Sequence, residues 1–103
     1  MDYKLVISER AEMHIDRILD YVVNVLKNPS AASSILDDIE DAYNKLEYMA
    51  ESLGYCHDLY LAEKGYRKII LSGHDYLILY KVDGNEVHVS GVFHMRENYA
   101  EKL

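Results

Sequence analysis

The segment V-F-H-M-R-E-N-Y, residues 92–99, brings three chemically active side chains together at the end of a run typical of a buried strand. His94, Arg96 and Tyr99 lie within six positions of one another. An imidazole or a phenol can transfer a proton, and a guanidinium can stabilise the charge of a phosphorane. Tyrosine and arginine are also frequent in binding hot spots. The segment could therefore cleave RNA, bind a protein, or form only the polar edge of a sheet.

More cationic and aromatic side chains occur in the strand-like runs that precede this segment. They are Tyr66, Arg67, Lys68, Tyr76 and Tyr80. Together with the C-terminal cluster they fit either metal-independent RNA cleavage or an interface rich in aromatic and arginine side chains. A third interpretation stays open, in which Tyr76 and Tyr80 border the core and Arg67 forms a structural ion pair.

Other chemistries lack the residues they need. The chain has five histidines, but none are spaced as H-x-H or H-x-x-x-H, and Cys56 is the only cysteine. The G-x-S-x-G motif of serine hydrolases and the G-x-x-x-x-G-K motif of phosphate-binding loops do not occur. We therefore expect no metal and no other cofactor.

Length and composition indicate one folded domain over residues 1–103. Half of the residues are hydrophobic and one is proline, which is not typical of a disordered chain. The apolar runs are far shorter than the roughly 18 residues of a membrane span, so we expect neither a membrane segment nor a signal peptide. A single cysteine fits a reducing compartment, and the predicted location is the cytoplasm.

Charge is distributed unevenly along the chain. The formal net charge is −7, which argues against general affinity for nucleic acid and against sequence-specific DNA binding by the chain alone. Residues 1–50 contain five Lys/Arg against ten Asp/Glu, whereas residues 64–96 contain five against three. Any anionic partner is therefore expected to bind the C-terminal half.

The N-terminal half reads as one strand and two helices. Residues 3–7 alternate as in a strand, and Ser8 can cap a helix whose apolar residues recur until about Lys27. Asn28-Pro29 can start a second helix, which ends before Gly54. The short connection predicts an antiparallel helical hairpin. Asp37, Asp38 and Asp41 are expected on its solvated face.

The C-terminal half reads as three strands, at residues 65–71, 76–82 and 86–93. The turns between them are short and contain glycine, so consecutive strands must be antiparallel. The predicted fold class is α+β with the order β-α-α-β-β-β. We expect an antiparallel twisted sheet with the helical hairpin packed on one face and the other face free to bind.

Several motifs in this order resemble the RelE/ParE superfamily of bacterial toxins from type II toxin–antitoxin modules. They are S-E-R-A (8–11), D-R-I-L-D-Y-V (16–22), N-P-S-A-A (28–32), G-Y-R (65–67), Y-L-I-L-Y-K-V (76–82) and V-F-H-M-R-E-N-Y (92–99). The resemblance covers nearly the whole chain and implies two helices on an antiparallel sheet, in agreement with the fold predicted above.

The two branches of the superfamily imply different mechanisms. RelE-like members resemble ribosome-dependent mRNA endonucleases with an Arg directly after the tyrosine that opens the third strand, where this chain has Leu77. ParE-like members carry G-Y-R, then S-G-H, then a strand ending in histidine, as here at residues 65–67, 72–74 and 92–94. The ParE-like resemblance, which we favour, implies inhibition of DNA gyrase by protein contact.

Three hypotheses follow from the resemblance. In the first, the chain binds gyrase through a surface that contains Tyr66, Arg67, Lys68, His74, Tyr76, Tyr80, His94, Arg96 and Tyr99. In the second, it is a ribosome-dependent mRNA endoribonuclease whose catalytic residues are Arg67, His94, Arg96 and Tyr99. In the third, it is a non-toxic relative. All three imply a cognate antitoxin protein, and an exposed sheet edge could accept an added strand from it.

Overall fold

The computed structural model describes residues 3–53 and 59–97, which form three α-helices, two short helical segments and four strands. In chain order they are β1 (Lys4–Ile7), α1 (Glu9–Asp20), the π-helical η1 (Tyr21–Val25), α2 (Pro29–Met49), the 3-10 segment η2 (Ala50–Ser52), α3 (Leu59–Glu63), β2 (Arg67–Ile70), β3 (Tyr76–Asp83) and β4 (Glu86–His94). This order confirms the predicted α+β class, and α3 is an addition between the hairpin and the sheet.

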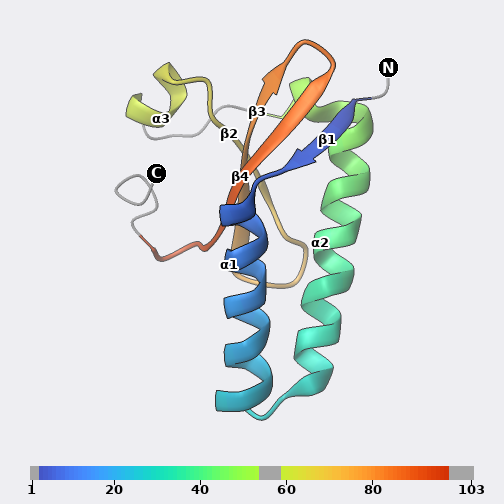
Figure 1. Cartoon of the computed structure of the whole chain (residues 1–103), viewed down its shortest axis with the longest axis vertical. Helices are drawn as coiled ribbons and strands as arrows, with labels where there is room; N and C mark the ends of the chain where they lie inside the picture. The colour runs from blue at the N-terminus through green and yellow to red at the C-terminus, as the bar shows by residue number, and fades with distance from the viewer. Residues whose placement is uncertain (1–2, 54–58, 98–103) are drawn as a thin grey trace.

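The two long helices begin at the residues that the sequence indicates. The Ser8 hydroxyl accepts a hydrogen bond from the Ala11 amide at 3.0 Å, and the Asn28 side chain accepts one from the Ala31 amide at 3.1 Å. The α-helical geometry of α1 ends earlier than predicted, because residues 21–25 adopt π-helical geometry. The helices run alongside each other, and their connection extends beyond the sheet (Figure 1).

The sheet has the strand order β1-β4-β3-β2 and is mixed. The predicted antiparallel pairing of β2 with β3 and of β3 with β4 is confirmed. The first strand differs from the expectation, since β1 lies parallel to β4 with Lys4 opposite Glu86. Short turns fix the direction of β2, β3 and β4, whereas the long helical connection after β1 imposes no such rule.

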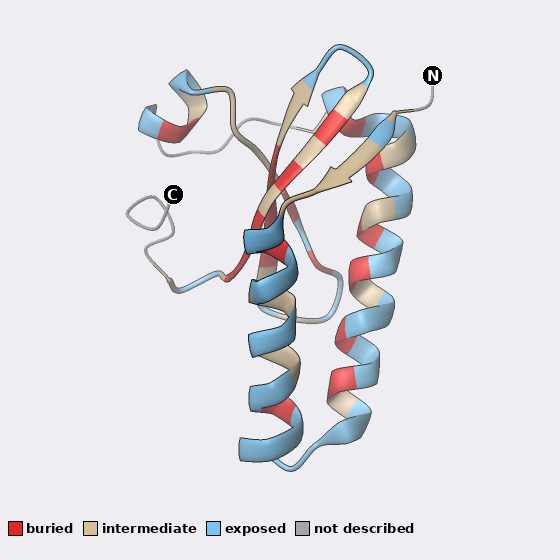
Figure 2. Cartoon of the chain, in the orientation of Figure 1, coloured by how far each residue is buried: buried red, intermediate tan, exposed pale blue. Residues whose placement is uncertain are grey.

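The main core lies between the helical hairpin and one face of the sheet, here called the helix face. Buried residues recur among exposed ones along α2, whereas Ala11 is the buried residue of α1 (Figure 2). The helices pack there on Ile78, Tyr80, Val87 and Val89. This burial is what fixes the hairpin on the sheet.

The opposite face, here called the second face, was predicted to be free. In the structure it is partly covered. Leu61 of α3 is fully buried there against Leu77, Leu79 and Phe93. The apolar run in β3 explains the difference, because alternate side chains point to opposite faces and both sets are apolar. The helix α3 therefore gives the second face a small core of its own.

Candidate functional site

Strand alternation separates the predicted site residues into different surroundings. Lys68 lies opposite Leu79 and therefore on the second face. Lys81 is on the same face, with its ammonium group 4.4 Å from the centre of the Tyr66 ring. These three side chains form a cationic and aromatic group beside the small core of α3. Tyr66 and Lys68 belong to the predicted binding surface, and all three residues are partly exposed.

Arg67 lies on the helix face instead. Its guanidinium donates to the carbonyl oxygens of Leu53 and, at 3.3 Å, of Glu51. The last carbonyls of a helix lack intrahelical partners, and a cation there also suits the helix dipole. Arg67 thus binds the segment that follows α2. A nuclease would instead need this guanidinium to contact the phosphate of its substrate.

Tyr80 is a correction to the predicted partner-binding surface. It is fully buried, and its hydroxyl donates to the Ala50 carbonyl at 2.8 Å. It shares the helix face with Ile78, because the two are separated by two positions on β3. A side chain with no exposed area cannot form a contact surface without unfolding, so Tyr80 is a core residue.

Tyr76 and His94 lie opposite each other at one end of the sheet. Their ring centres are 5.3 Å apart and the rings meet edge to face. Burial raises the pKa of Tyr76, and the carboxylate of Glu97 raises it further. Tyr76 is therefore neutral at physiological pH and can donate a hydrogen bond or pack against a partner.

The imidazole ring of His94 is engaged with the turn that follows β4. Nδ1 accepts a hydrogen bond from the Arg96 amide at 3.1 Å, which assigns the proton to Nε2. The His94 amide in turn donates to the Glu97 carboxylate at 2.9 Å. A general base needs an available lone pair directed at its substrate. This arrangement suits a residue that shapes the turn more than one that removes a proton.

The last predicted residues lie after the sheet. Arg96 is exposed in the turn that follows β4. Tyr99, predicted as both a catalytic and a binding residue, lies outside the described residues.

His74 joins the turn before β3 to the second helix. Its Nδ1 atom and the Asp38 carboxylate form a hydrogen-bonded pair. The two side chains are 23% and 16% exposed, so the pair is mostly shielded from water. Asp38 therefore does not belong to the solvated acidic face that the sequence predicts, and His74 has a structural contact on the helical side.

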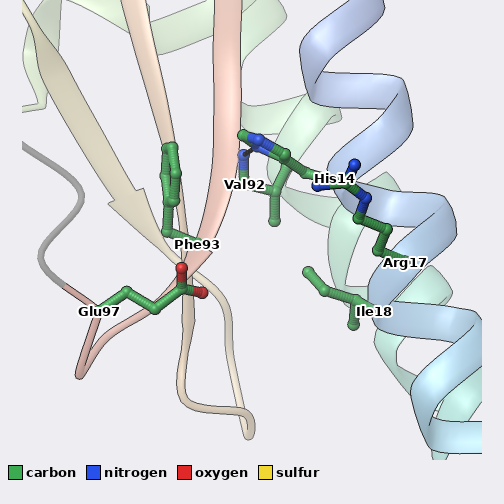
Figure 3. Close-up of a pocket in the computed structure, with 6 residues that line it drawn as sticks. All are labelled: His14, Arg17, Ile18, Val92, Phe93 and Glu97. Carbon is green, nitrogen blue, oxygen red and sulfur yellow. Dashed lines mark hydrogen bonds between the residues drawn. The ribbon is translucent and has the colours of Figure 1, made fainter. Parts of the chain in front are cut away.

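A cleft of about 160 Å³ lies between α1 and the end of β4 (Figure 3). Its lining residues are His14, Arg17, Ile18, Val92, Phe93 and Glu97. The predicted site did not include His14 or Arg17. Their spacing with Ile18 places all three on one side of a helix, which is the only sequence signal for them.

Two negative findings concern the described part of the chain. Residues 3–53 and 59–97 contain no group of three or more His, Cys, Asp or Glu side chains that could hold a metal ion. Within the same residues, no helix combines the length and the apolar character needed to cross a membrane.

Comparisons with known proteins agree with this architecture. The family model described as "ParE toxin of type II toxin-antitoxin system, parDE" matches residues 5–99. A solved structure titled "Chromosomal ParDE TA system from P. aeruginosa" superimposes with a TM-score of 0.74 at 22% identity, covering 89% of this chain and 95% of that one. No curated protein matches in sequence. Because the family match spans nearly the whole chain, this protein belongs to the ParE toxin family of type II toxin–antitoxin systems.

Proposed function

We propose that the protein inhibits DNA gyrase by direct binding, without breaking a covalent bond itself. The proposed contact surface comprises the exposed C-terminal turn with Arg96, the Tyr76–His94 pair beside it, and the group of Tyr66 and Lys68 on the second face. An exposed arginine beside packed aromatic rings has the composition of a binding hot spot. Membership in the ParE family supports the choice of target.

The observation that carries this proposal is the dispersal of the groups that a nuclease would need. Arg67 is engaged with the carbonyls of Glu51 and Leu53, on the helix face. His94 uses Nδ1 to accept the Arg96 amide. Transition-state stabilisation requires charge and base to converge on one phosphate within hydrogen-bonding distance. The described residues contain no such convergence.

Leu77 also argues against a nuclease, because it is apolar where RelE-like relatives are expected to carry a charge. RelE-like relatives are expected to carry an arginine at this position, and here Leu77 is 2% exposed and packs with Leu61 and Phe93. An apolar residue in a dry cluster supplies no charge to a phosphate. The net charge of −7 also disfavours docking to ribosomal RNA.

We further propose that a cognate antitoxin protein neutralises this chain. The strand order leaves β2 at one edge of the sheet, and Ile70 on that strand is 49% exposed. An edge strand offers backbone groups to an added strand, and an exposed apolar side chain adds contact area. The predicted antitoxin contact at the sheet edge thus has a physical basis at β2.

The test is induced expression in bacteria with three parallel measurements, namely growth, chromosomal DNA breaks and mapping of mRNA ends. We expect growth arrest with DNA breaks and intact transcripts, and inhibition of supercoiling when purified chain is added to gyrase. Rapid transcript cleavage with intact DNA would overturn the proposal in favour of an endoribonuclease. Normal growth and unaffected supercoiling would overturn it in favour of a non-toxic relative.

A further inference from the structure

One edge of β4 changes its hydrogen-bonding partner partway along the strand. Its first residues pair with β1, and this pairing ends with Ile7 opposite Val89. Register with β3 shifts at the same place, since Leu79 pairs with Gly91 and Tyr80 with Val89, which leaves Ser90 as the extra residue of a bulge. In the described part of the chain, residues 91–94 therefore have no strand paired to the edge of β4 that faces away from β3. The helix α1 lies beside this edge instead.

The direction of the next amides follows from the antiparallel pairing with β3. Since the Met95 amide donates to the Asp75 carbonyl at 2.8 Å, the alternate amides of Val92 and His94 point away from β3, toward α1. A side chain receives each of them. The Val92 amide donates to His14 Nδ1 at 3.2 Å, and the His94 amide donates to the Glu97 carboxylate at 2.9 Å.

His14 makes a second contact with the strand through its ring. It meets the Phe93 ring edge to face at 4.7 Å between centres. A Cβ atom at Gly91 would lie 3.1 Å from the His14 ring and 2.6 Å from the Phe93 ring, so only glycine permits this packing. Figure 3 shows the His14 ring reaching from α1 to the backbone of Val92.

We propose that His14 is a positioning residue for the C-terminal segment. It binds the last part of β4 to α1 immediately before the chain turns at His94 and exposes Arg96. The direction in which this segment leaves the sheet is thereby set by a helix distant in sequence. The inference rests on the proposed function in one respect, namely that this segment contacts gyrase.

Two substitutions distinguish the effect of the hydrogen-bond acceptor of His14 from the effect of its aromatic ring. His14→Asn keeps an acceptor at the δ position and removes the aromatic ring, whereas His14→Phe keeps a ring and leaves the Val92 amide without its acceptor. Gly91→Ala is an independent variant, because its methyl group lies too close to the Phe93 and His14 rings for both to keep their positions. Met13→Ala, next to His14 on α1 and outside the cleft, is the matched control.

The first measurement is amide hydrogen exchange, which does not depend on any activity. We expect exchange at Val92 and Arg96 to become about tenfold faster in His14→Phe and to stay near the wild-type rate in His14→Asn and Met13→Ala. The second measurement is gyrase inhibition, well below the melting temperature of each variant. About tenfold more His14→Phe or Gly91→Ala than wild-type chain should be required.

The outcomes distinguish this inference from the proposed function. If wild-type chain inhibits gyrase and His14→Phe inhibits it equally, the positioning role is wrong. If wild-type chain does not inhibit gyrase, the proposed function fails, and amide exchange alone decides the role of His14. Unchanged exchange at Val92 and Arg96 in both His14→Phe and Gly91→Ala overturns the inference, and faster exchange at both amides supports it.

Discussion

Arg67 and Tyr80 lie directly opposite each other on β2 and β3, and both donate hydrogen bonds to the carbonyl end of the second helix. Tyr80 binds the Ala50 carbonyl from inside the core, while Arg67 binds those of Glu51 and Leu53 nearer the surface. Helix carbonyls at this end have no intrahelical donors. One cross-strand pair therefore fastens the hairpin to the sheet.

Replacing Arg67 should reduce stability before it affects any activity. We expect Arg67→Ala to lower the free energy of unfolding by about 1–3 kcal/mol, because the partly buried Leu53 carbonyl and the exposed Glu51 carbonyl lose their charged donor. Urea unfolding measures this loss. Tyr80→Phe, which removes only a hydroxyl, is the comparison and should cost about 1 kcal/mol. An unchanged unfolding midpoint in Arg67→Ala together with lost activity would instead assign Arg67 to the functional surface.

Tyr43 should make stability fall at alkaline pH. Burial, and next the carboxylate of Glu12, raise its pKa from 10.0 to about 12. The unfolded chain therefore loses this proton at a lower pH than the folded chain. The stabilisation that the neutral phenol gives the folded state is complete below pH 10, and the free energy of unfolding falls as the pH rises from 10 to 12. Tyr43→Phe should show a shallower decline in unfolding free energy over this interval, measured by urea unfolding.

The same variant tests a buried hydroxyl. In the described residues, the Tyr43 hydroxyl is buried without a hydrogen-bond partner. Its removal should leave stability at pH 7 unchanged or increase it by up to about 1 kcal/mol. Tyr48→Phe, at a position that is 62% exposed on the same helix, is the control. A clear loss of stability in Tyr43→Phe alone would show that the hydroxyl is hydrogen-bonded in solution.

Leu77 should not tolerate the arginine of the RelE-like branch. Its neighbours Leu61, Leu79 and Phe93 are apolar, so Leu77→Arg would place a charge in a dry cluster. We expect a loss above about 3 kcal/mol, detected as a lower melting temperature or as insoluble protein. Leu77→Met keeps the volume and should cost less than about 1.5 kcal/mol. A stable Leu77→Arg variant would show that the second face is more open than described.

Arg96 should matter for binding and not for stability. Its side chain is exposed in the turn after β4. Arg96→Ala should keep the wild-type unfolding midpoint and weaken gyrase binding by about tenfold or more, as expected for an interface arginine. Titration of labelled chain with purified gyrase measures the affinity. Equal affinity of Arg96→Ala and wild type would remove Arg96 from the proposed surface.

The helices and the three consecutive strands could be predicted because their signals are local. Ser8 and Asn28 cap their helices in the structure as the sequence indicates. Strand alternation also contained the correct position of Arg67, since it is two residues from Ile69 and shares its buried face. Alternation therefore favours the structural interpretation of Arg67 over the catalytic one.

Other features depend on contacts between distant residues. The parallel pairing of β1, the pair formed by His74 and Asp38, and the contact of His14 with Val92 each join segments that no local pattern connects. The helix α3 has only five residues, too few for a periodic pattern to be recognised. Its burial on the second face follows from tertiary packing alone.

The parallel pair of β1 and β4 has a consequence for synthesis of this protein. Lys4 is synthesised well before its partner Glu86, with all the helices of the described chain between them. Helical hairpins can form from local contacts while translation continues, but contacts between distant residues must wait for both partners. On the ribosome, the first strand therefore stays unpaired until β4 emerges. The sheet is therefore completed only after synthesis of β4, the strand that leads directly into the segment exposing Arg96.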